Sequence, residues 1–256
     1  MKKYIKDFVL TENKQLHSAY ALMKFRPQDG ELPDMLPGQF VEVRIDDSTT
    51  TYLRRPISIH NIDSNNKELW LLVRRAGDGT NRLASYKEGT IVNMVLPLGN
   101  TFTMPADKQH QPLLIGGGVG VAPLLYWGKV LQEQGLRPAF LLGARTDKDL
   151  LQLDEFEAVG DVYLSTEDGS AGEKGFVTQH SVLQQQFSYI YTCGPKPMMQ
   201  AVARIAREKD VPCEVSLENM MACGVGACLC CVEDTVEGHV CVCKEGPIFN
   251  IDRLKW

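Results

Sequence analysis

The sequence lacks any hydrophobic run long enough to cross a membrane. Its longest largely apolar stretch, Pro112 to Trp127, is shorter than the about 20 residues that a transmembrane helix needs, and four glycines interrupt it. No apolar segment follows the charged residues at the N-terminus, so we expect no secretory signal peptide. These absences predict a cytoplasmic protein without a membrane span.

Positive charge is scarce as well. The chain has 27 Lys and Arg against 32 Asp and Glu, which gives a formal net charge of −5, and it contains no basic run. Nucleic-acid binding depends on clustered positive charge, so we expect no nucleic-acid partner. The 256 residues are 44% hydrophobic and 23% charged, which is typical of a globular protein with room for two compact domains and a small third part.

Cysteine, by contrast, is abundant and clustered: six of the eight cysteines fall within residues 223–243. Cys223, Cys228 and Cys231 follow the C-x4-C-x2-C spacing of plant-type [2Fe–2S] proteins, which need one more distant cysteine as the fourth ligand. Cys243 can supply that ligand, and Cys241 competes with it. The sequence therefore predicts a four-thiolate iron–sulfur site in this segment.

A zinc site or a disulfide framework fits these cysteines less well. A zinc site usually shows paired C-x2-C units, and only one good pair is present here. Disulfides are typical of secreted chains, and buried structural thiols do not cluster so densely. Gly224 and Gly226 also allow a tight loop whose N–H groups turn toward the sulfurs.

The first part of the chain, from Phe8 to Asn100, reads as short strands separated by turn signals. Alternating or apolar segments predict strands over residues 40–45, 56–60, 69–73 and 91–96. Several short strands of this kind favour a small antiparallel β-barrel.

The middle of the chain alternates strands with helices. Residues 112–115 predict a buried strand, residues 116–123 a glycine-rich turn and residues 124–134 a helix, an arrangement that brings a phosphate to a helix N-terminus. Pro123 stands where the Rossmann fingerprint has its third glycine, so this is not that motif. Further units are predicted from strands at 138–145, 161–166 and 189–193 and helices at 150–159 and 198–208.

Two segments of the barrel resemble the flavin-binding motifs of the ferredoxin-reductase-like family. Arg54-Arg55-Pro56-Ile57-Ser58 is similar to its Arg-x-x-Ser motif, which implies that Arg55 clamps the FAD phosphate and Ser58 approaches the ring. Residues 73–81 resemble the second flavin segment. Ile57 stands where many relatives carry an aromatic residue that stacks on the flavin. The FAD-binding residues implied by this resemblance are Arg55, Pro56, Ile57, Ser58, Leu72, Val73, Arg74, Gly79 and Thr80.

Two further segments resemble the nicotinamide-nucleotide motifs of the same family. The glycine-rich turn is similar to its Gly-Gly-x-Gly-x-x-Pro loop, and Cys193-Gly194-Pro195 to its nicotinamide-end motif. In the family this cysteine approaches the nicotinamide and flavin rings, which makes Cys193 the catalytic candidate; otherwise it is a small buried residue at a strand end. The implied NAD-binding residues are Gly116, Gly117, Gly118, Gly120, Cys193, Gly194 and Pro195.

The choice between NAD and NADP depends on a few charges. Arg145 could reach a 2′-phosphate, but Asp147 would repel one, and Asp168 could hydrogen-bond a free ribose hydroxyl. We expect NAD. Cys213 is interpreted as a buried structural thiol.

The order of these parts predicts an α+β multidomain chain. It comprises an antiparallel β-barrel FAD domain (residues 1–103), an α/β parallel-sheet NAD domain (104–213) and a small C-terminal [2Fe–2S] module (214–256). This order, and above all the stretch from Ser216 to Cys228, resembles the electron-transfer subunits of class 1B, NAD-dependent dihydroorotate dehydrogenases.

The resemblance implies a role in pyrimidine (UMP) biosynthesis. Electrons from dihydroorotate would pass from an FMN-containing catalytic subunit through [2Fe–2S] and FAD to NAD⁺. The implied assembly is a heterotetramer with two copies of each subunit. It also implies Cys223, Cys228, Cys231 and Cys243 as the cluster ligands.

Three alternatives stay open. The same architecture could serve another redox complex, such as a hydrogenase or a ferredoxin:NADP reductase. It could also be a stand-alone diaphorase or oxygenase reductase. The third alternative is a non-catalytic, zinc-stabilised nucleotide-binding module, which would be colourless.

Overall fold

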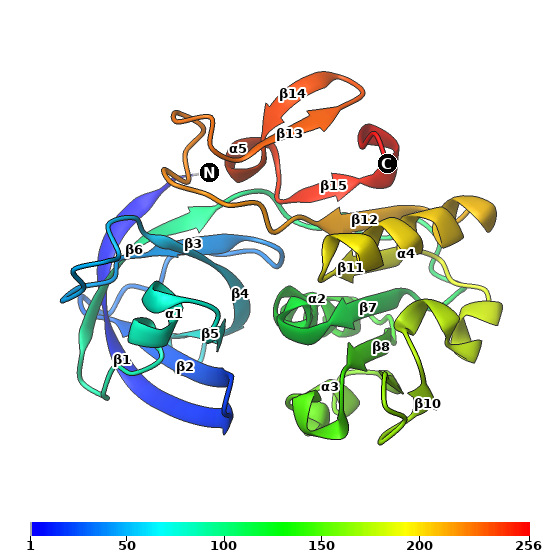
Figure 1. Ribbon diagram of the computed structural model, residues 1–256, viewed down its shortest axis with the longest axis horizontal. Helices are drawn as coiled ribbons and strands as arrows, with labels where there is room; N and C mark the ends of the chain where they lie inside the picture. Colours follow the sequence, from blue (N-terminus) through cyan, green and yellow to red (C-terminus); the bar gives the residue numbers. More distant parts are fainter. Residues whose placement is uncertain (1) are drawn as a thin grey trace. The chain divides into compact units, whose positions relative to one another are not determined.

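The computed structural model describes residues 2–256 (Figure 1). Contacts within the chain divide it into two compact units. Unit 1 comprises Met1–Thr101, Asn219–Glu233 and His239–Pro247, and unit 2 comprises Phe102–Glu218, Asp234–Gly238 and Ile248–Trp256. Among the described residues, no helix is long and apolar enough to cross a bilayer.

Unit 1 contains a closed antiparallel barrel with the strand order β1-β2-β5-β4-β3-β6. Its elements are β1 (Tyr4–His17), β2 (Tyr20–Pro27), β3 (Phe40–Val43), β4 (Arg55–Asp63), β5 (Glu68–Arg74), α1 (Asp78–Leu83) and β6 (Ile91–Leu98). Alternate side chains fill the interior, among them Phe8, Phe25 and Leu71, which are fully buried. The predicted barrel is confirmed, and the four predicted strands correspond to β3, β4, β5 and β6.

Unit 2 is built on a seven-stranded sheet with the order β10-β9-β8-β7-β11-β12-β15. All neighbouring strands are parallel except β15, which pairs antiparallel with β12. The strands are β7 (Leu113–Gly117), β8 (Ala139–Ala144), β9 (Asp161–Thr166), β10 (Glu173–Lys174), β11 (Ile190–Cys193), β12 (Cys213–Ser216) and β15 (Ile248–Asn250). The predicted parallel-sheet domain is therefore confirmed.

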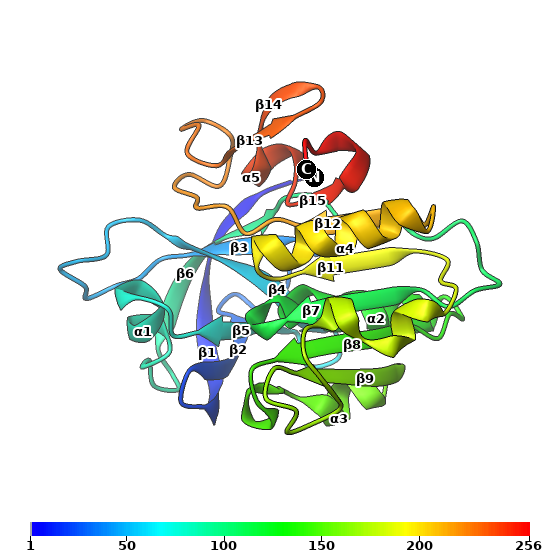
Figure 2. The ribbon, with the colours of Figure 1, turned by 45° about the vertical axis from the view of Figure 1, so that its right-hand side comes forward.

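Helices connect the parallel strands. A 3₁₀ turn, η1 (Gly118–Val121), leads from β7 into α2 (Ala122–Glu133), and α4 (Lys196–Glu208) follows β11. Figure 2 shows α4 running beside β11 and β12. The helix expected over residues 150–159 is shorter, because Gln152 has a left-handed φ of +53° and α3 (Leu153–Glu157) begins after it.

The C-terminal part of the chain adds small elements. A two-stranded sheet is formed by β13 (Val232–Thr235) and β14 (Gly238–Cys241), and α5 (Val242–Glu245) follows at once. The Thr235 hydroxyl donates to the Gly238 carbonyl at 2.7 Å, which closes the turn between the strands.

Candidate cofactor sites

The segment from Cys223 to Cys231, called the cysteine loop below, turns its backbone N–H groups toward sulfur atoms. The Cys223 sulfur accepts hydrogen bonds from Val225 N at 3.4 Å and Ala227 N at 3.3 Å, and the Cys243 sulfur accepts one from Gly226 N at 3.1 Å. Gly224 and Gly226 have φ values of +66° and +82°, which favour glycine. Such N–H···S bonds stabilise thiolate ligands of an iron–sulfur cluster.

The four predicted ligands form two pairs. The Cys228 thiol hydrogen-bonds Cys223, and the Cys231 thiol lies in hydrogen-bonding contact with Cys243. Within residues 2–256, no group of three or more His, Cys, Asp or Glu side chains is arranged to hold a single metal ion. A [2Fe–2S] cluster is held by four cysteine thiolates, and these four cysteines stay its predicted ligands.

The protonation of these thiols follows from their surroundings. Burial raises the pKa of Cys223, but backbone N–H groups, including those of Val225 and Ala227, outweigh this effect and lower the pKa to about 6. Burial and the neighbouring Cys231 raise the pKa of Cys243 to about 12. The Cys223 thiol is therefore ionised at neutral pH, whereas iron would displace the proton of Cys243 on binding.

The two candidates for the fourth ligand differ in their environment. Cys243 is buried, and its sulfur accepts an N–H bond. The Cys241 sulfur instead faces the Gly226 carbonyl at 3.9 Å, as a protonated thiol would. This difference favours Cys243, which stays a prediction. Cys230 is exposed, and its sulfur lies 3.7 Å from a backbone carbonyl.

The two predicted flavin segments meet in unit 1. A Cβ on Gly79 would lie 2.5 Å from Arg55 Nε, so the guanidinium packs where only glycine leaves room. Arg55 Nη1 also donates to the Leu53 carbonyl at 2.8 Å, which fixes the side chain. A guanidinium held against the first turn of α1 suits a phosphate group, and the residues thus fit the phosphate of FAD.

Thr80 organises the turn that carries this segment. Its hydroxyl oxygen accepts hydrogen bonds from Ala76 N at 2.9 Å and Gly77 N at 3.2 Å. The side chain therefore caps the start of α1. With its oxygen occupied in this way, Thr80 would contact a phosphate chiefly through the backbone that it positions.

The other predicted flavin residues lie along β4 and β5. Pro56, Ile57 and Ser58 are half-buried, and Arg74 is exposed at the end of β5. The side chains of Leu72 and Val73 are both buried, so a cofactor would meet chiefly their backbone. The structure thus brings the predicted segments together without testing their individual roles.

The glycine-rich turn and the nicotinamide-end motif meet in unit 2. In the register of β7 and β11, Gly116 pairs with Cys193 at the carboxyl ends of both strands. A Cβ on Gly120 would lie 2.3 Å from the Cys193 carbonyl oxygen, so the two backbones touch. A nucleotide binds at this edge in open α/β sheets.

The remaining glycines shape the same junction. A Cβ on Gly117 would lie 2.6 Å from Met198 Sδ and 3.2 Å from Pro195 Cδ. Gly118 has a φ of +57°, which turns the chain from β7 into η1. A glycine-rich turn between a strand and a helix suits a pyrophosphate, because its backbone amides can approach the phosphate oxygens.

Cys193 has a neighbour that the motif does not identify. Its side chain is fully buried, and its sulfur lies 3.8 Å from Glu218 Oε1. Burial raises the pKa of Cys193 well above its usual value, and the Glu218 charge adds to this, so the thiol stays protonated. Cys193 pairs with Ser216 at the ends of β11 and β12. No local pattern in the sequence identifies Glu218, because its contact with Cys193 joins residues 25 positions apart.

Acidic loops follow β8 and β9. Asp168 accepts hydrogen bonds from Ser170 Oγ at 2.6 Å and Ser170 N at 3.0 Å, and Ser170 Oγ accepts one from Asp147 N at 2.8 Å. The Ser170 bonds lower the pKa of Asp168, so this loop carries a negative charge. The charge supports NAD over NADP, which stays a prediction.

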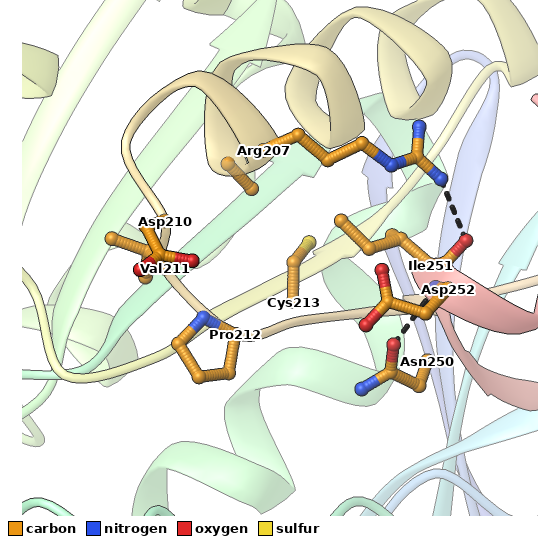
Figure 3. Close-up of a pocket in the computed structure, with 9 residues that line it drawn as sticks. Arg207, Asp210, Val211, Pro212, Cys213, Asn250, Ile251 and Asp252 are labelled. Carbon is orange, nitrogen blue, oxygen red and sulfur yellow. Dashed lines mark hydrogen bonds between the residues drawn. The ribbon is translucent and has the colours of Figure 1, made fainter.

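A cavity of about 360 Å³ lies at the opposite edge of this sheet (Figure 3). Its lining includes Arg207, Asp210, Cys213 and Asp252. Cys213 pairs with Ile190 at the amino ends of β12 and β11, so the cavity is not the predicted nucleotide site. Cys213 itself is buried, as predicted.

Comparisons with known proteins agree with these parts. Residues 218–255 match the family described as the iron–sulfur cluster binding domain of dihydroorotate dehydrogenase B, and residues 114–204 match the oxidoreductase NAD-binding domain. The chain is 43% identical to the dihydroorotate dehydrogenase B (NAD(+)) electron transfer subunit of Lysinibacillus sphaericus, covering 86% of this chain and 88% of the relative. The corresponding Fusobacterium nucleatum subunit is 36% identical over 96% of both chains.

Solved structures show the same architecture. A structure of the NADH-dependent reduced ferredoxin-NADP oxidoreductase has a TM-score of 0.86 and 29% identity, covering 97% of this chain and 90% of that chain. The ferredoxin reductase in carbazole 1,9a-dioxygenase has a TM-score of 0.70 and 21% identity, covering 83% of this chain and 68% of that one. The second likeness concerns the fold alone.

Proposed function

Because the chain belongs to the family of dihydroorotate dehydrogenase B electron transfer subunits, we propose that it passes electrons from a dihydroorotate-oxidising catalytic subunit to NAD⁺ in pyrimidine biosynthesis. The observation that carries the proposal is the cysteine loop, whose N–H···S bonds lie within the segment that matches the family's cluster domain. When bound, FAD exchanges electron pairs with the nicotinamide, whereas the [2Fe–2S] cluster carries single electrons.

The residues of this chain would bind and orient these groups. Cys223, Cys228, Cys231 and Cys243 hold the cluster, as two pairs. In unit 1, Arg55 neutralises the FAD phosphate and Ser58 lies three residues further along β4. In unit 2, the glycine turn and Cys193 with its neighbours bind the nicotinamide nucleotide. The buried Cys193 thiol excludes water and remains protonated beside Glu218.

Replacing Arg55 by alanine is expected to weaken FAD binding about 10- to 100-fold, which corresponds to the loss of a hydrogen bond to a charged group. Flavin content after gel filtration and the FAD dissociation constant measure this loss. Arg44→Ala is the matched control, because Arg44 is exposed on the barrel and its guanidinium pairs with Asp46 at 2.8 Å. An Arg55→Ala protein that keeps stoichiometric flavin contradicts the assignment.

The family name implies a catalytic partner, and we propose that this partner contains FMN and forms a heterotetramer with two copies of each subunit. Exposed apolar side chains surround the cysteine loop: Met220 is 84% exposed, Leu229 66% and Val225 42%. Such a group beside a redox site suits a protein interface, and electron transfer favours a short distance between cofactors. We place the partner on this face.

Mixing the chain with the catalytic subunit is expected to give NAD⁺-dependent oxidation of dihydroorotate that neither protein shows alone, in a complex with the mass of two of each. Met220→Asp is expected to weaken assembly at least about tenfold, because the interface would then bury an unpaired charge. Ile91→Asp is the control, because Ile91 is also an apolar residue that is 50% exposed. It lies at the far end of β6 from Leu98, the residue of that strand that packs near the cysteine loop. Equal assembly by both variants places the partner elsewhere.

The alternative within the same architecture is a reductase subunit of the ferredoxin:NADP type. It is favoured by the structural likeness of 29% identity over 97% of this chain. Electron delivery to ferredoxin, with no orotate formed when the catalytic subunit is present, would support this alternative.

A further inference from the structure

One buried carboxyl group has no function in the sites described so far. Glu42 lies on β3 and is only 1% exposed. Across residues 2–256, neither of its carboxyl oxygens has a hydrogen-bond partner. Burying a carboxyl without such partners is unfavourable by several kcal/mol in order of magnitude, so its presence calls for a reason.

The cysteine loop packs directly on this carboxyl. A Cβ on Gly224 would lie 2.8 Å from Glu42 Cγ and 3.3 Å from Glu42 Oε1, and Leu98 Cδ1 would be 2.9 Å away. Gly224 follows the predicted ligand Cys223, and the Cys223 thiolate and Glu42 repel each other electrostatically. The carboxyl therefore lies beneath the backbone that carries the cluster ligands.

Two arginine charges act on the Glu42 carboxyl. Arg54 and Arg55 are the cationic groups that act on the carboxyl. The Arg54 guanidinium hydrogen-bonds Asn93: Nη1 donates to the Asn93 carbonyl at 3.0 Å and Nη2 donates to Asn93 Oδ1 at 2.6 Å. In the described part of the chain, neither arginine donates a hydrogen bond to the Glu42 carboxyl, so its charge is attracted but not paired.

The strand register separates Glu42 from Arg55 on the β3–β4 pair. Glu42 pairs with Pro56, and side chains of paired residues share a face of the sheet. Arg55 and Ile57 flank Pro56 in sequence and therefore point to the other face. The β3–β4 pair thus presents Glu42 to the cysteine loop and Arg55 to the flavin segment.

We propose that Glu42 is a positioning residue whose buried charge lowers the reduction potential of the cluster held by the cysteine loop. This inference rests on the proposed function, because it requires a [2Fe–2S] cluster on these cysteines. Reduction adds one negative charge to the cluster, and a carboxylate in a poorly screened interior opposes that charge. Net charge near a cluster is one of the factors that set its potential.

Glu42→Gln keeps the shape of the side chain and removes its charge, so it is the decisive variant. The midpoint potential is measured by redox titration of purified protein at pH 8.5, followed by the electron paramagnetic resonance of the reduced cluster. Burial raises the pKa of Glu42 to about 7, so the titration is made above that value. We expect the potential to rise by at least the equivalent of tenfold in the reduction equilibrium, about 59 mV for one electron.

Glu68→Gln is the matched control. Glu68 is a largely buried carboxylate on β5 of the same barrel, and its charge pairs with Arg26 at 2.9 Å. Its substitution is expected to leave the cluster potential unchanged. Equal potentials for wild type and Glu42→Gln, each with full iron and sulfide content, overturn the inference.

Two further outcomes are decisive as well. If Glu42→Gln loses its cluster, the same titration is made on Glu42→Asp, because aspartate keeps the charge. A potential that rises by less than about 59 mV over wild type supports the inference. A rise of that size or more overturns it. A wild-type protein without a cluster overturns the proposed function together with this inference, and is recognised by its iron content.

Discussion

Replacing Cys223 by alanine is expected to abolish the [2Fe–2S] cluster. The Cys223 sulfur accepts two backbone N–H bonds and lies beside Cys228, so its loss removes one thiolate of a pair and leaves an iron with an incomplete ligand set. Iron and acid-labile sulfide per chain should fall from about two of each to near zero, as a [2Fe–2S] composition requires. Flavin content should remain, because the flavin segments lie on β4, β5 and α1.

The same segment provides controls for this prediction. Cys230 lies between two predicted ligands but is exposed and has its sulfur against a carbonyl, so Cys230→Ala should keep the full cluster. Comparing Cys241→Ala with Cys243→Ala identifies the fourth ligand, and we expect only the second to lose iron. A full cluster in Cys243→Ala would assign that role to Cys241, and a full cluster in Cys223→Ala would contradict the ligand set.

Replacing Gly120 by alanine is expected to reduce NADH oxidation about 100-fold, the effect typical of a misplacement of about 1 Å in a reacting pair. A Cβ here would lie 2.3 Å from the Cys193 carbonyl oxygen and 2.6 Å from Gly194 Cα, and neither backbone atom can rotate away. The glycine turn and the nicotinamide-end motif would therefore move apart. NADH-dependent reduction of an artificial acceptor, measured at several NADH concentrations, reports the loss.

Gly135→Ala is the matched control for this substitution in the same domain. Gly135 follows α2, and a Cβ there meets no atom within 4 Å, although its φ of +80° makes alanine somewhat strained. It should lose some stability while keeping NADH oxidation, and both variants should retain FAD and cluster. Unchanged NADH oxidation in Gly120→Ala would remove the glycine turn from the nucleotide site.

The strands that the sequence predicted well have strong local signals. β3 to β6 carry alternating or apolar residues between turn residues, and β7 and β11 are buried runs that end at glycines. β1 and β2 were not predicted individually, because a polar stretch from Thr11 to Gln15 interrupts the alternation where β1 has register shifts. β15 pairs with β12, which precedes it by more than thirty residues, and no local pattern indicates such a pairing.

The residues of the candidate sites also fall into those that local sequence predicts and those that it does not. Glycines and cysteines were predictable because their spacing reflects short-range geometry, such as the positive φ of Gly224 and Gly226. Glu42 and Glu218 were not, because each becomes informative only when distant segments pack: Glu42 against Gly224, and Glu218 against Cys193. A carboxylate in a strand or after one carries no signal of its own.

The most direct test of the electron-transfer account is the visible spectrum of the anaerobically purified chain before and after addition of NADH. The account predicts flavin bands with a broad iron–sulfur shoulder, both bleached by NADH, because all three binding sites lie on this one chain. A colourless protein that contains zinc would contradict it and leave a nucleotide-binding scaffold.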